Sequence, residues 1–169
     1  MERILKTIYK SPVGDMTMGS YGDKLCICDW TDTRQRVAID RRICRKLDAI
    51  YQDGLSEVIL AAIAQLDEYF AGVRKEFSIP LVFTGSGFQC SVWTELLDIP
   101  YGTTISYKEL AHRIGNPNAV RAVAAANATN PISIFVPCHR VIGSDNRLTG
   151  YGGGLHAKQW LLSHEACRK

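Results

Sequence analysis

The residues whose types and spacing suggest chemistry are Cys138 and His139, which follow Pro137 and an apolar run at 132–136. A thiolate is the attacking form of cysteine, and a nearby base or positive charge, such as His139 or Arg140, raises its population at neutral pH. Buried cysteines without a chemical role are also common. The apolar run predicts a strand that displays either a nucleophile or a structural thiol at its end.

Adjacency in sequence limits how these two side chains can cooperate. Consecutive side chains of a strand point to opposite faces, so Cys138 and His139 need a turn at Pro137, or a bridging water, to work together. A third group that orients the imidazole would complete a Cys-His-acid arrangement. We predict that Glu165, late in the chain, is this acid.

The composition is that of an ordinary globular protein. The chain has 169 residues, of which 46% are hydrophobic and 22% charged, enough for one sizeable core or two small ones. It has no run of about 18 apolar residues and begins with charged ones, so we expect neither a membrane span nor a secretory signal. The six cysteines lack the CxxC spacing of metal sites, which predicts reduced thiols, no bound metal and a cytoplasmic protein.

The net charge is unevenly divided along the chain. Residues 1–83 hold 12 basic and 12 acidic residues, whereas residues 84–169 hold 8 and 5, so the whole excess of +3 lies in the second half. The half that carries Cys138 is therefore the half suited to a polyanion, although a local patch matters more than net charge.

The first half is predicted to be a small α+β domain over residues 1–83. Alternating apolar and polar residues predict three antiparallel strands, at 4–9, 16–20 and 24–30. Residues 78–83 suggest one more strand. The basic segment 34–46 fits a loop, a frayed helix or a solvated surface.

A helix is predicted between these strands. Apolar residues recur three and four positions apart from Leu55 to Phe70, with Ser56 as a cap and Gly72 after the end. Such a helix would bury its apolar stripe against the sheet.

The second half turns largely helical after the linker 84–87, which starts a second domain over 88–169. Helical patterns at 107–114 and 119–128, joined by a short turn with Gly and Pro, give a helix-turn-helix outline. The second of these helices is rich in alanine, so it suits either tight packing or close approach to a DNA groove. A final helix is expected over 157–167.

Eight short motifs occur in order between residues 88 and 165: Ile105-Ser106-Tyr107, Gly115-Asn116-Pro117, Arg121-Ala122-Val123, Asn130-Pro131, Pro137-Cys138-His139-Arg140-Val141, Gly153-Gly154-Leu155, Trp160-Leu161-Leu162 and His164-Glu165. This set closely resembles O6-alkylguanine-DNA alkyltransferase. The resemblance implies an α+β protein with a ribonuclease H-like N-terminal domain and a C-terminal winged helix-turn-helix domain.

The resemblance also implies a reaction. The protein would bind duplex DNA through the minor groove as a monomer, flip an O6-alkylguanine (or an O4-alkylthymine) into a pocket and move the alkyl group to Cys138. His139 would accept the Cys138 proton through a water, and Glu165 would hold the useful tautomer; Tyr107 would donate a proton to the leaving guanine. Each molecule would act once, without a cofactor.

The resemblance implies DNA contacts and a pocket as well. The expected DNA-binding residues are Arg121, Asn130, Ala122, Ala125 and Ser106. Arg121 matches a finger that replaces the flipped base in the stack, and Asn130 matches a hinge. The expected pocket residues are Val141, Ser144, Tyr151, Gly153 and Ser133. The loop at Thr149-Gly150 departs from some relatives, which leaves the tolerance for bulky adducts open, and their N-terminal zinc ligands have no counterpart.

Three other functions remain compatible with parts of the sequence. A damage-binding relative would hold the lesion without reacting, but such proteins replace the cysteine that is present here as Cys138. A helix-turn-helix transcription factor would normally need a dimerisation element, and none is visible. A cysteine hydrolase using Cys138, His139 and Glu165 would turn over instead of stopping after one equivalent.

Overall fold

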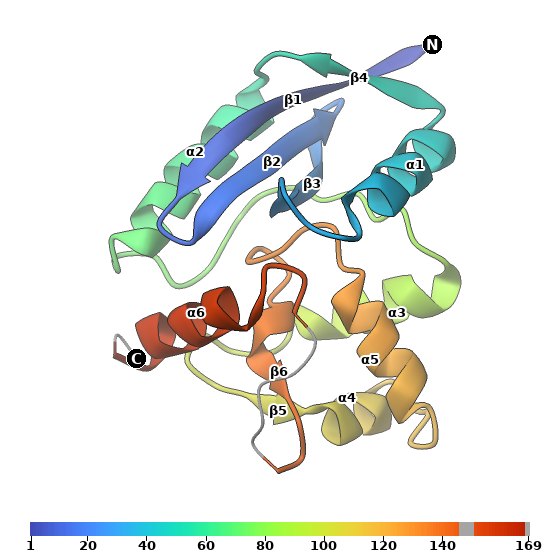
Figure 1. The fold of residues 1–169 in the computed structure, drawn as a ribbon, viewed down its shortest axis with the longest axis vertical. Helices are drawn as coiled ribbons and strands as arrows, with labels where there is room; N and C mark the ends of the chain where they lie inside the picture. The colour runs from blue at the N-terminus through green and yellow to red at the C-terminus, as the bar shows by residue number, and fades with distance from the viewer. Residues whose placement is uncertain (146–150, 168–169) are drawn as a thin grey trace. The chain divides into compact units, whose positions relative to one another are not determined.

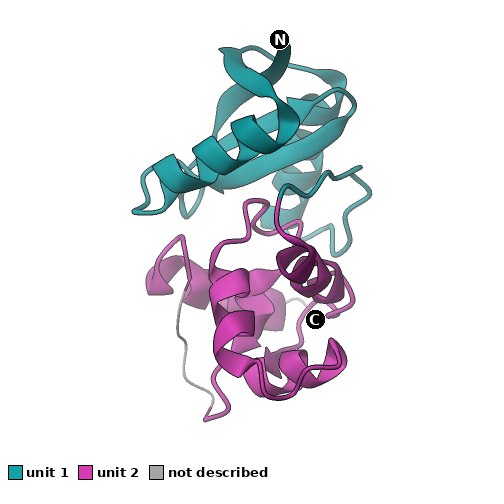
Figure 2. Cartoon of the chain, turned by 90° about the vertical axis from the view of Figure 1, so that its right-hand side faces the viewer, with its two compact units in different colours: residues 1–84 teal, residues 85–169 magenta. Residues whose placement is uncertain are grey.

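The computed structural model describes residues 1–145 and 151–167, and Thr149 and Gly150 lie outside this part. The chain divides into two compact units, Met1–Thr84 and Gly85–Lys169 (Figures 1 and 2). The first combines a sheet with helices, and the second is mainly helical, so the fold is of the α+β class.

The first unit is built on a four-stranded sheet. The strands β1 (Glu2–Ser11), β2 (Gly14–Tyr21) and β3 (Lys24–Trp30) form two antiparallel pairs, which confirms the three predicted strands. A short fourth strand, β4 (Ala49–Asp53), pairs in parallel with β1 and completes the order β3-β2-β1-β4. Sequence patterns missed β4 because five residues give too few alternations to identify a strand.

Two helices accompany this sheet (Figure 1). The predicted helix is α2 (Glu57–Phe70), and its cap is confirmed because Ser56 Oγ accepts a hydrogen bond from the Ile59 amide at 3.2 Å. The basic segment that sequence left open is also a helix, α1 (Arg36–Leu47), anchored by the buried side chains of Ile39 and Ile43. Two apolar positions four residues apart hold it in place, which is a weak signal in the sequence.

The strand predicted at residues 78–83 is wrong. The segment makes only an isolated bridge between Leu81 and Leu25, with the Leu25 amide donating to Pro80 O at 2.8 Å and the Val82 amide to Leu25 O at 3.0 Å. Proline has no amide hydrogen to donate, so pairing cannot continue past Pro80.

The second unit contains the predicted helix-turn-helix, formed by α4 (Tyr107–Arg113) and α5 (Val120–Ala128). The unit also contains the helices α3 (Gly87–Leu96) and α6 (Leu155–Cys167), and the short strands β5 (Ile105–Ser106) and β6 (Val141–Ile142) pair in parallel. Between α4 and α5 the backbone turns at Gly115, whose φ of 78° favours glycine. The core contains Trp93, whose indole nitrogen donates to Ala126 O of α5 at 2.8 Å.

The helices in residues 1–145 and 151–167 include none with the length and apolar character that a membrane crossing requires.

Replacing Gly85 with alanine should destabilise the second unit. A Cβ at Gly85 would lie 2.6 Å from two ring atoms of Trp93, and this ring is fully buried and hydrogen-bonded. We expect a loss of about 1–3 kcal/mol of unfolding free energy by urea denaturation.

Gly87→Ala is the matched control, because a Cβ there meets nothing within 4 Å. It should leave stability unchanged or raise it by about 0.5 kcal/mol. Equal stability of the two variants would show that Trp93 does not constrain position 85.

Candidate active site

The segment before Cys138 is a compact buried loop, and the strand predicted at 132–136 is wrong. The Val136 amide donates to Ile132 O at 3.0 Å, and Ile134 has a φ of 73°, so the chain turns on itself. After Pro137, residues Cys138–Arg140 form a short 3₁₀ helix, η1. This turn removes the strand geometry that would have sent the side chains of Cys138 and His139 to opposite faces.

Asn130 supplies the hydrogen bonds that a neighbouring strand would otherwise provide. Its Oδ1 accepts from the Ile132 amide at 3.0 Å, and its Nδ2 donates to Val136 O at 2.9 Å. The side chain is 3% exposed, so the structure does not place it among the exposed residues predicted to bind DNA. Its position between α5 and the loop fits the hinge that the resemblance implied.

Cys138 itself lies in this buried setting. The residue is 4% exposed, its amide donates to Val136 O at 2.8 Å, and its carbonyl accepts from Asn127 Nδ2 at 3.2 Å. Asn127 belongs to α5, so the cysteine backbone is attached directly to the second helix of the helix-turn-helix.

Glu165 is the acid beside His139, as predicted from the sequence. Its Oε2 lies 2.7 Å from His139 Nε2, and both side chains are buried. Arg140 was not assigned to this group, yet its Nε and Nη2 donate to the same carboxylate at 2.8 Å and 3.1 Å. The Gly102 amide adds a weaker donor at 3.3 Å. One carboxylate thus joins α6, η1 and the loop before β5.

These contacts set the charges at the site. Burial alone would raise the pKa of Glu165, but the hydrogen bonds and charges of His139 and Arg140 outweigh it and hold that pKa well below its usual value. Burial lowers the pKa of His139, and the cations of Arg140 and Lys158 lower it further against the pull of Glu165. The pair is therefore an ionised carboxylate and a neutral imidazole.

A neutral imidazole facing a carboxylate has its tautomer fixed. Nε2 must carry the hydrogen that bonds to Glu165, which leaves Nδ1 as an acceptor. Nδ1 is buried and makes no hydrogen bond with any residue in the described part of the chain. The imidazole is thus prepared to receive a proton at Nδ1.

Lys158 is a site residue that the sequence reasoning missed. It is fully buried on α6, and its Nζ donates to Val141 O at 2.6 Å and lies 5.8 Å from the Tyr107 ring centroid. Burial lowers its pKa to about 8, while the charge of Cys138 acts in the opposite direction. Lys158, Leu161 and Glu165 lie on one buried face of α6, and two charged residues on such a face are a recognisable signal.

Tyr107 begins α4 and is 8% exposed. Ser106, predicted to bind DNA, caps this helix, since its Oγ accepts from the Glu109 amide at 3.0 Å. The pairing of Ile105 with Val141 places β5 beside β6. Tyr107 and Val141 therefore lie close together, because Lys158 contacts both and because β5, which precedes Tyr107, pairs with β6.

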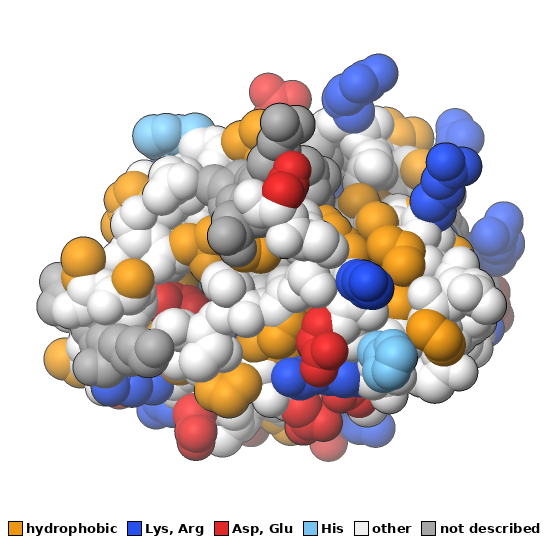
Figure 3. Space-filling view, turned by 90° about the horizontal axis from the view of Figure 1, so that it is seen from below, with side chains coloured by type: hydrophobic (Ala, Val, Ile, Leu, Met, Phe, Trp, Pro, Cys, Tyr) orange, Lys and Arg blue, Asp and Glu red, His pale blue; other side chains and the backbone are white. Residues whose placement is uncertain are grey.

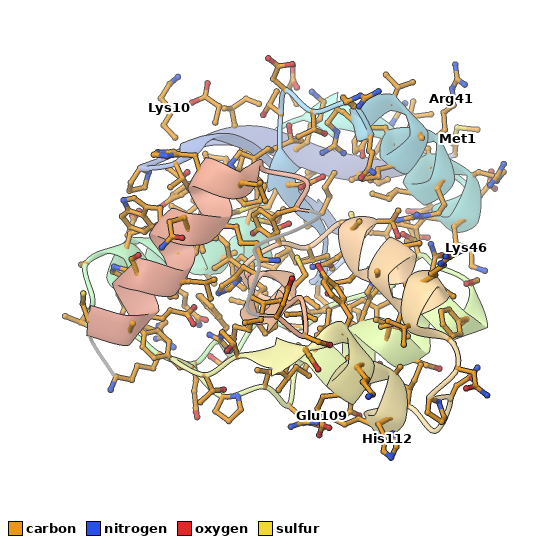
Figure 4. The ribbon with its side chains drawn as sticks, turned by 60° about the horizontal axis from the view of Figure 1, so that its bottom comes forward. Met1, Lys10, Arg41, Lys46, Glu109 and His112 are labelled. Atoms are coloured by element: carbon orange, nitrogen blue, oxygen red, sulfur yellow. The ribbon has the colours of Figure 1, made fainter. Side chains whose placement is uncertain are left out.

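The exposed side of α5 carries three of the predicted DNA-binding residues: Arg121, Ala122 and Ala125. Val123 and Ala126 are buried on the opposite side. The side chain of Arg121 makes no hydrogen bond or ion pair with residues in the described part of the chain. Glu109 and His112 project from the neighbouring α4 (Figure 4).

The predicted pocket residues differ in their burial and in whether they contact the site. Ser133 is 3% exposed inside the loop before Cys138, and the carbonyl of Val141 accepts a hydrogen bond from Lys158. Ser144 is exposed, whereas Tyr151 and Gly153 are half-buried beyond the undescribed residues 146–150. The structure thus brings Val141 to the site, and no described contact joins Ser144 to it.

Comparison with known proteins shows which family the chain belongs to. The family profile described as 6-O-methylguanine DNA methyltransferase, ribonuclease-like domain matches residues 4–83, and the DNA binding domain profile of the same family matches residues 87–167. The chain belongs to this methyltransferase family. The predicted family and fold are thereby confirmed.

Individual members of the family are similar over most of their length. The methylated-DNA--protein-cysteine methyltransferase of Mycobacterium bovis is 42% identical over 164 residues, covering 94% of this chain and 90% of the relative. The protein of the same name from Methanosarcina acetivorans is 40% identical, covering 94% and 96%. The crystal structure of Mycobacterium tuberculosis OGT in complex with DNA matches with a TM-score of 0.82 at 40% identity, covering 98% and 94%.

Acid should destabilise the protein through His139. Its pKa in the folded protein lies below the unfolded value of about 6.5, so the unfolded chain takes up this proton first as the pH falls. The contribution to stability is fully present above about pH 6.5 and declines below it, by up to about 1.4 kcal/mol per pH unit. Urea denaturation at pH 7.5 and 5.5 measures this loss.

His139→Gln should reduce the difference between the two pH values, and His156→Gln, at an exposed position of α6, should not. The same pH dependence in all three proteins would contradict the assignment of a buried neutral imidazole.

Proposed function

We propose that this protein repairs alkylated DNA by direct reversal. It transfers the alkyl group of O6-alkylguanine, or of O4-alkylthymine, in duplex DNA to Sγ of Cys138, once per molecule and as a monomer. The bond from the base oxygen to the alkyl carbon breaks, and a bond from that carbon to sulfur forms. The thioether product has no route back to the thiol, and the reaction needs no cofactor.

The single observation that carries this proposal is the buried group around Cys138 in a chain of this family. Lys158 and Arg140 are cations, Glu165 is an anion and His139 is neutral, so the site holds one excess positive charge before the thiol ionises. A thiolate at Cys138 would balance that charge. The proton leaves through a water to Nδ1 of His139, the nitrogen that the tautomer keeps free.

The remaining roles belong to the same proposal. Tyr107 donates a proton to the guanine as the alkyl group leaves, and Lys158 beside its ring favours the developing phenolate. Arg121, Ala122 and Ala125 form the exposed side of α5 that contacts DNA, and Arg121 enters the stack behind the flipped base. The groups around Ser144, Tyr151 and Gly153 border the pocket.

A reducing, cytoplasmic location fits this chemistry. All six cysteines are free, including the exposed Cys167, and the nucleophile must remain a thiol until it meets DNA.

Stoichiometry tests the proposal most directly. After mixing with a duplex that contains one O6-methylguanine, intact-protein mass spectrometry should show a gain of one methyl group on Cys138. The reaction should stop at one equivalent, and Cys138→Ser should remain unmodified.

Turnover beyond one equivalent would identify a hydrolase instead. An unmodified parent protein that still binds the lesion would identify a damage-binding protein.

Arg121→Ala should slow repair of duplex DNA by about 10- to 100-fold, because a flipped base costs a few kcal/mol and the finger offsets part of it. Reaction with a free-base O6-alkylguanine should be nearly unchanged, since nothing is flipped. Single-turnover rates on both substrates measure the ratio.

Arg121→Lys keeps the charge but loses the planar guanidinium, so its duplex rate should lie between those of the parent and Arg121→Ala. Equal losses on the duplex and the free base would remove the finger assignment.

A further inference from the structure

The first unit carries a concentration of positive charge that the proposed reaction does not use. Residues 34–46 hold six basic residues and one acidic residue, whereas the remainder of 1–83 holds six basic and eleven acidic. The unit has no net charge as a whole, but its positive charge is concentrated in this one segment. Nearly all of this basic segment lies in α1.

The only acid of α1 is already committed. Asp40 accepts from Arg36 one turn away and from Tyr51 Oη at 2.6 Å. Arg36 also lies 3.7 Å from Asp29 and is mostly buried. These contacts attach the inner side of α1 to the sheet and leave no carboxylate of the helix for its other cations.

The outer cations of α1 have no such partners. Arg41, Arg45 and Lys46 are exposed, and their side chains make no hydrogen bond or ion pair with residues 1–145 or 151–167. Two other cations of the unit do have carboxylate partners: the half-buried Lys6 pairs with Asp53 at 3.2 Å, and the exposed Lys10 pairs with Asp15 at 3.3 Å. Like charges left together on one helix repel each other and favour an anionic partner.

We call these three exposed cations the α1 basic face: Arg41, Arg45 and Lys46, of which Arg41 and Arg45 share one side of the helix and Lys46 follows Arg45 in the chain. Arg41 and Arg45 are one helical turn apart, and the three positions span about 7.5 Å of helix axis at 1.5 Å per residue. Arg41 and Lys46 project outward from α1 in Figure 4, and Lys10 lies near the far end of β1, away from this helix. In the view from below, Lys and Arg side chains gather along the upper right margin (Figure 3).

We propose that the α1 basic face binds the phosphate backbone of duplex DNA. A strand of B-DNA presents one phosphate per about 3.4 Å of axis, so the face matches about two successive phosphates. Long cationic side chains without base-reading partners suit contacts that carry no sequence information. The inference rests on the proposed function only in naming DNA as the polyanion.

A lipid surface fits the same face less well. Amphipathic helices that lie on membranes present large apolar side chains beside their cations, and Val37 is the one large exposed hydrophobic residue of α1 in the described structure. The inner apolar residues, Ile39 and Ile43, are buried in the core of the unit. The balance of charge over apolar area therefore favours nucleic acid.

The test is DNA binding by the full chain carrying Arg41→Gln, Arg45→Gln and Lys46→Gln together. Fluorescence anisotropy with an undamaged duplex, at several KCl concentrations, gives the affinity and its dependence on salt. Each lost phosphate contact should lower the slope of log K against log salt by about 0.9. We expect a reduction of about 2 and an affinity at least tenfold lower at low salt.

The matched control carries Lys10→Gln, Lys24→Gln and Lys75→Gln, which removes the same charge from exposed positions of the same unit outside α1. It should change the slope by less than half as much. An α1 variant that binds like this control, or like the parent, would overturn the proposal.

Two more measurements distinguish a phosphate contact from damage to the helix and from membrane binding. Arg41→Lys with Arg45→Lys keeps the charge and should keep the slope, so a loss there equal to that of the glutamine variant would indicate damage to the helix and overturn the phosphate contact. Anionic phospholipid vesicles form the second arm. Loss of vesicle binding with DNA binding intact would assign the face to membranes.

Because the assay uses undamaged DNA and unmodified protein, it remains interpretable if alkyl transfer fails. If Cys138 never accepts a methyl group, substitutions in the α1 basic face can still lower DNA affinity. Conversely, a protein that transfers the alkyl group can still lack this phosphate contact.

Discussion

A single buried carboxylate organises the second unit. Glu165 accepts from His139, from Arg140 twice and from Gly102, and these donors come from η1 and from the loop before β5. A buried charge is stable only when it is paired and hydrogen-bonded. Removing Arg140 or Glu165 would leave the charge of the other buried without a partner. The positions of α6, η1 and the loop before β5, and the protonation state of the site, therefore depend on the same contacts.

The arrangement separates two tasks that one residue could not perform. Arg140 neutralises Glu165, and Glu165 then orients His139 without holding it as a cation. Lys158 has other contacts: its ammonium group donates to the backbone carbonyl of Val141 and lies near the Tyr107 ring. A histidine bonded to a carboxylate alone would have a higher pKa, so a larger fraction would already be protonated at neutral pH and unable to accept the Cys138 proton.

Much of this architecture could be predicted from sequence, because the hydrophobic periodicity of a helix or a hairpin is visible within a short segment of the chain. The strands before Trp30, the helix capped by Ser56 and the helix-turn-helix all follow from patterns within a few turns of chain. The pairing of His139 with Glu165 was predicted from the residue types, the late position of Glu165 and the family resemblance. Lys158, Arg140 and Asn130 were not assigned their contacts, because a buried polar side chain is recognised only once its distant partner is known.

Ile134 shows how the loop before the cysteine is held. A β-branched residue at a φ of 73° is strained by about 1–2 kcal/mol, and Ile134 keeps this conformation while 1% exposed. The loop is therefore fixed by burial and by Asn130, without a long ladder of strand hydrogen bonds. Access of solvent reagents to the thiol of Cys138, which is 4% exposed, therefore depends on how firmly this loop is held.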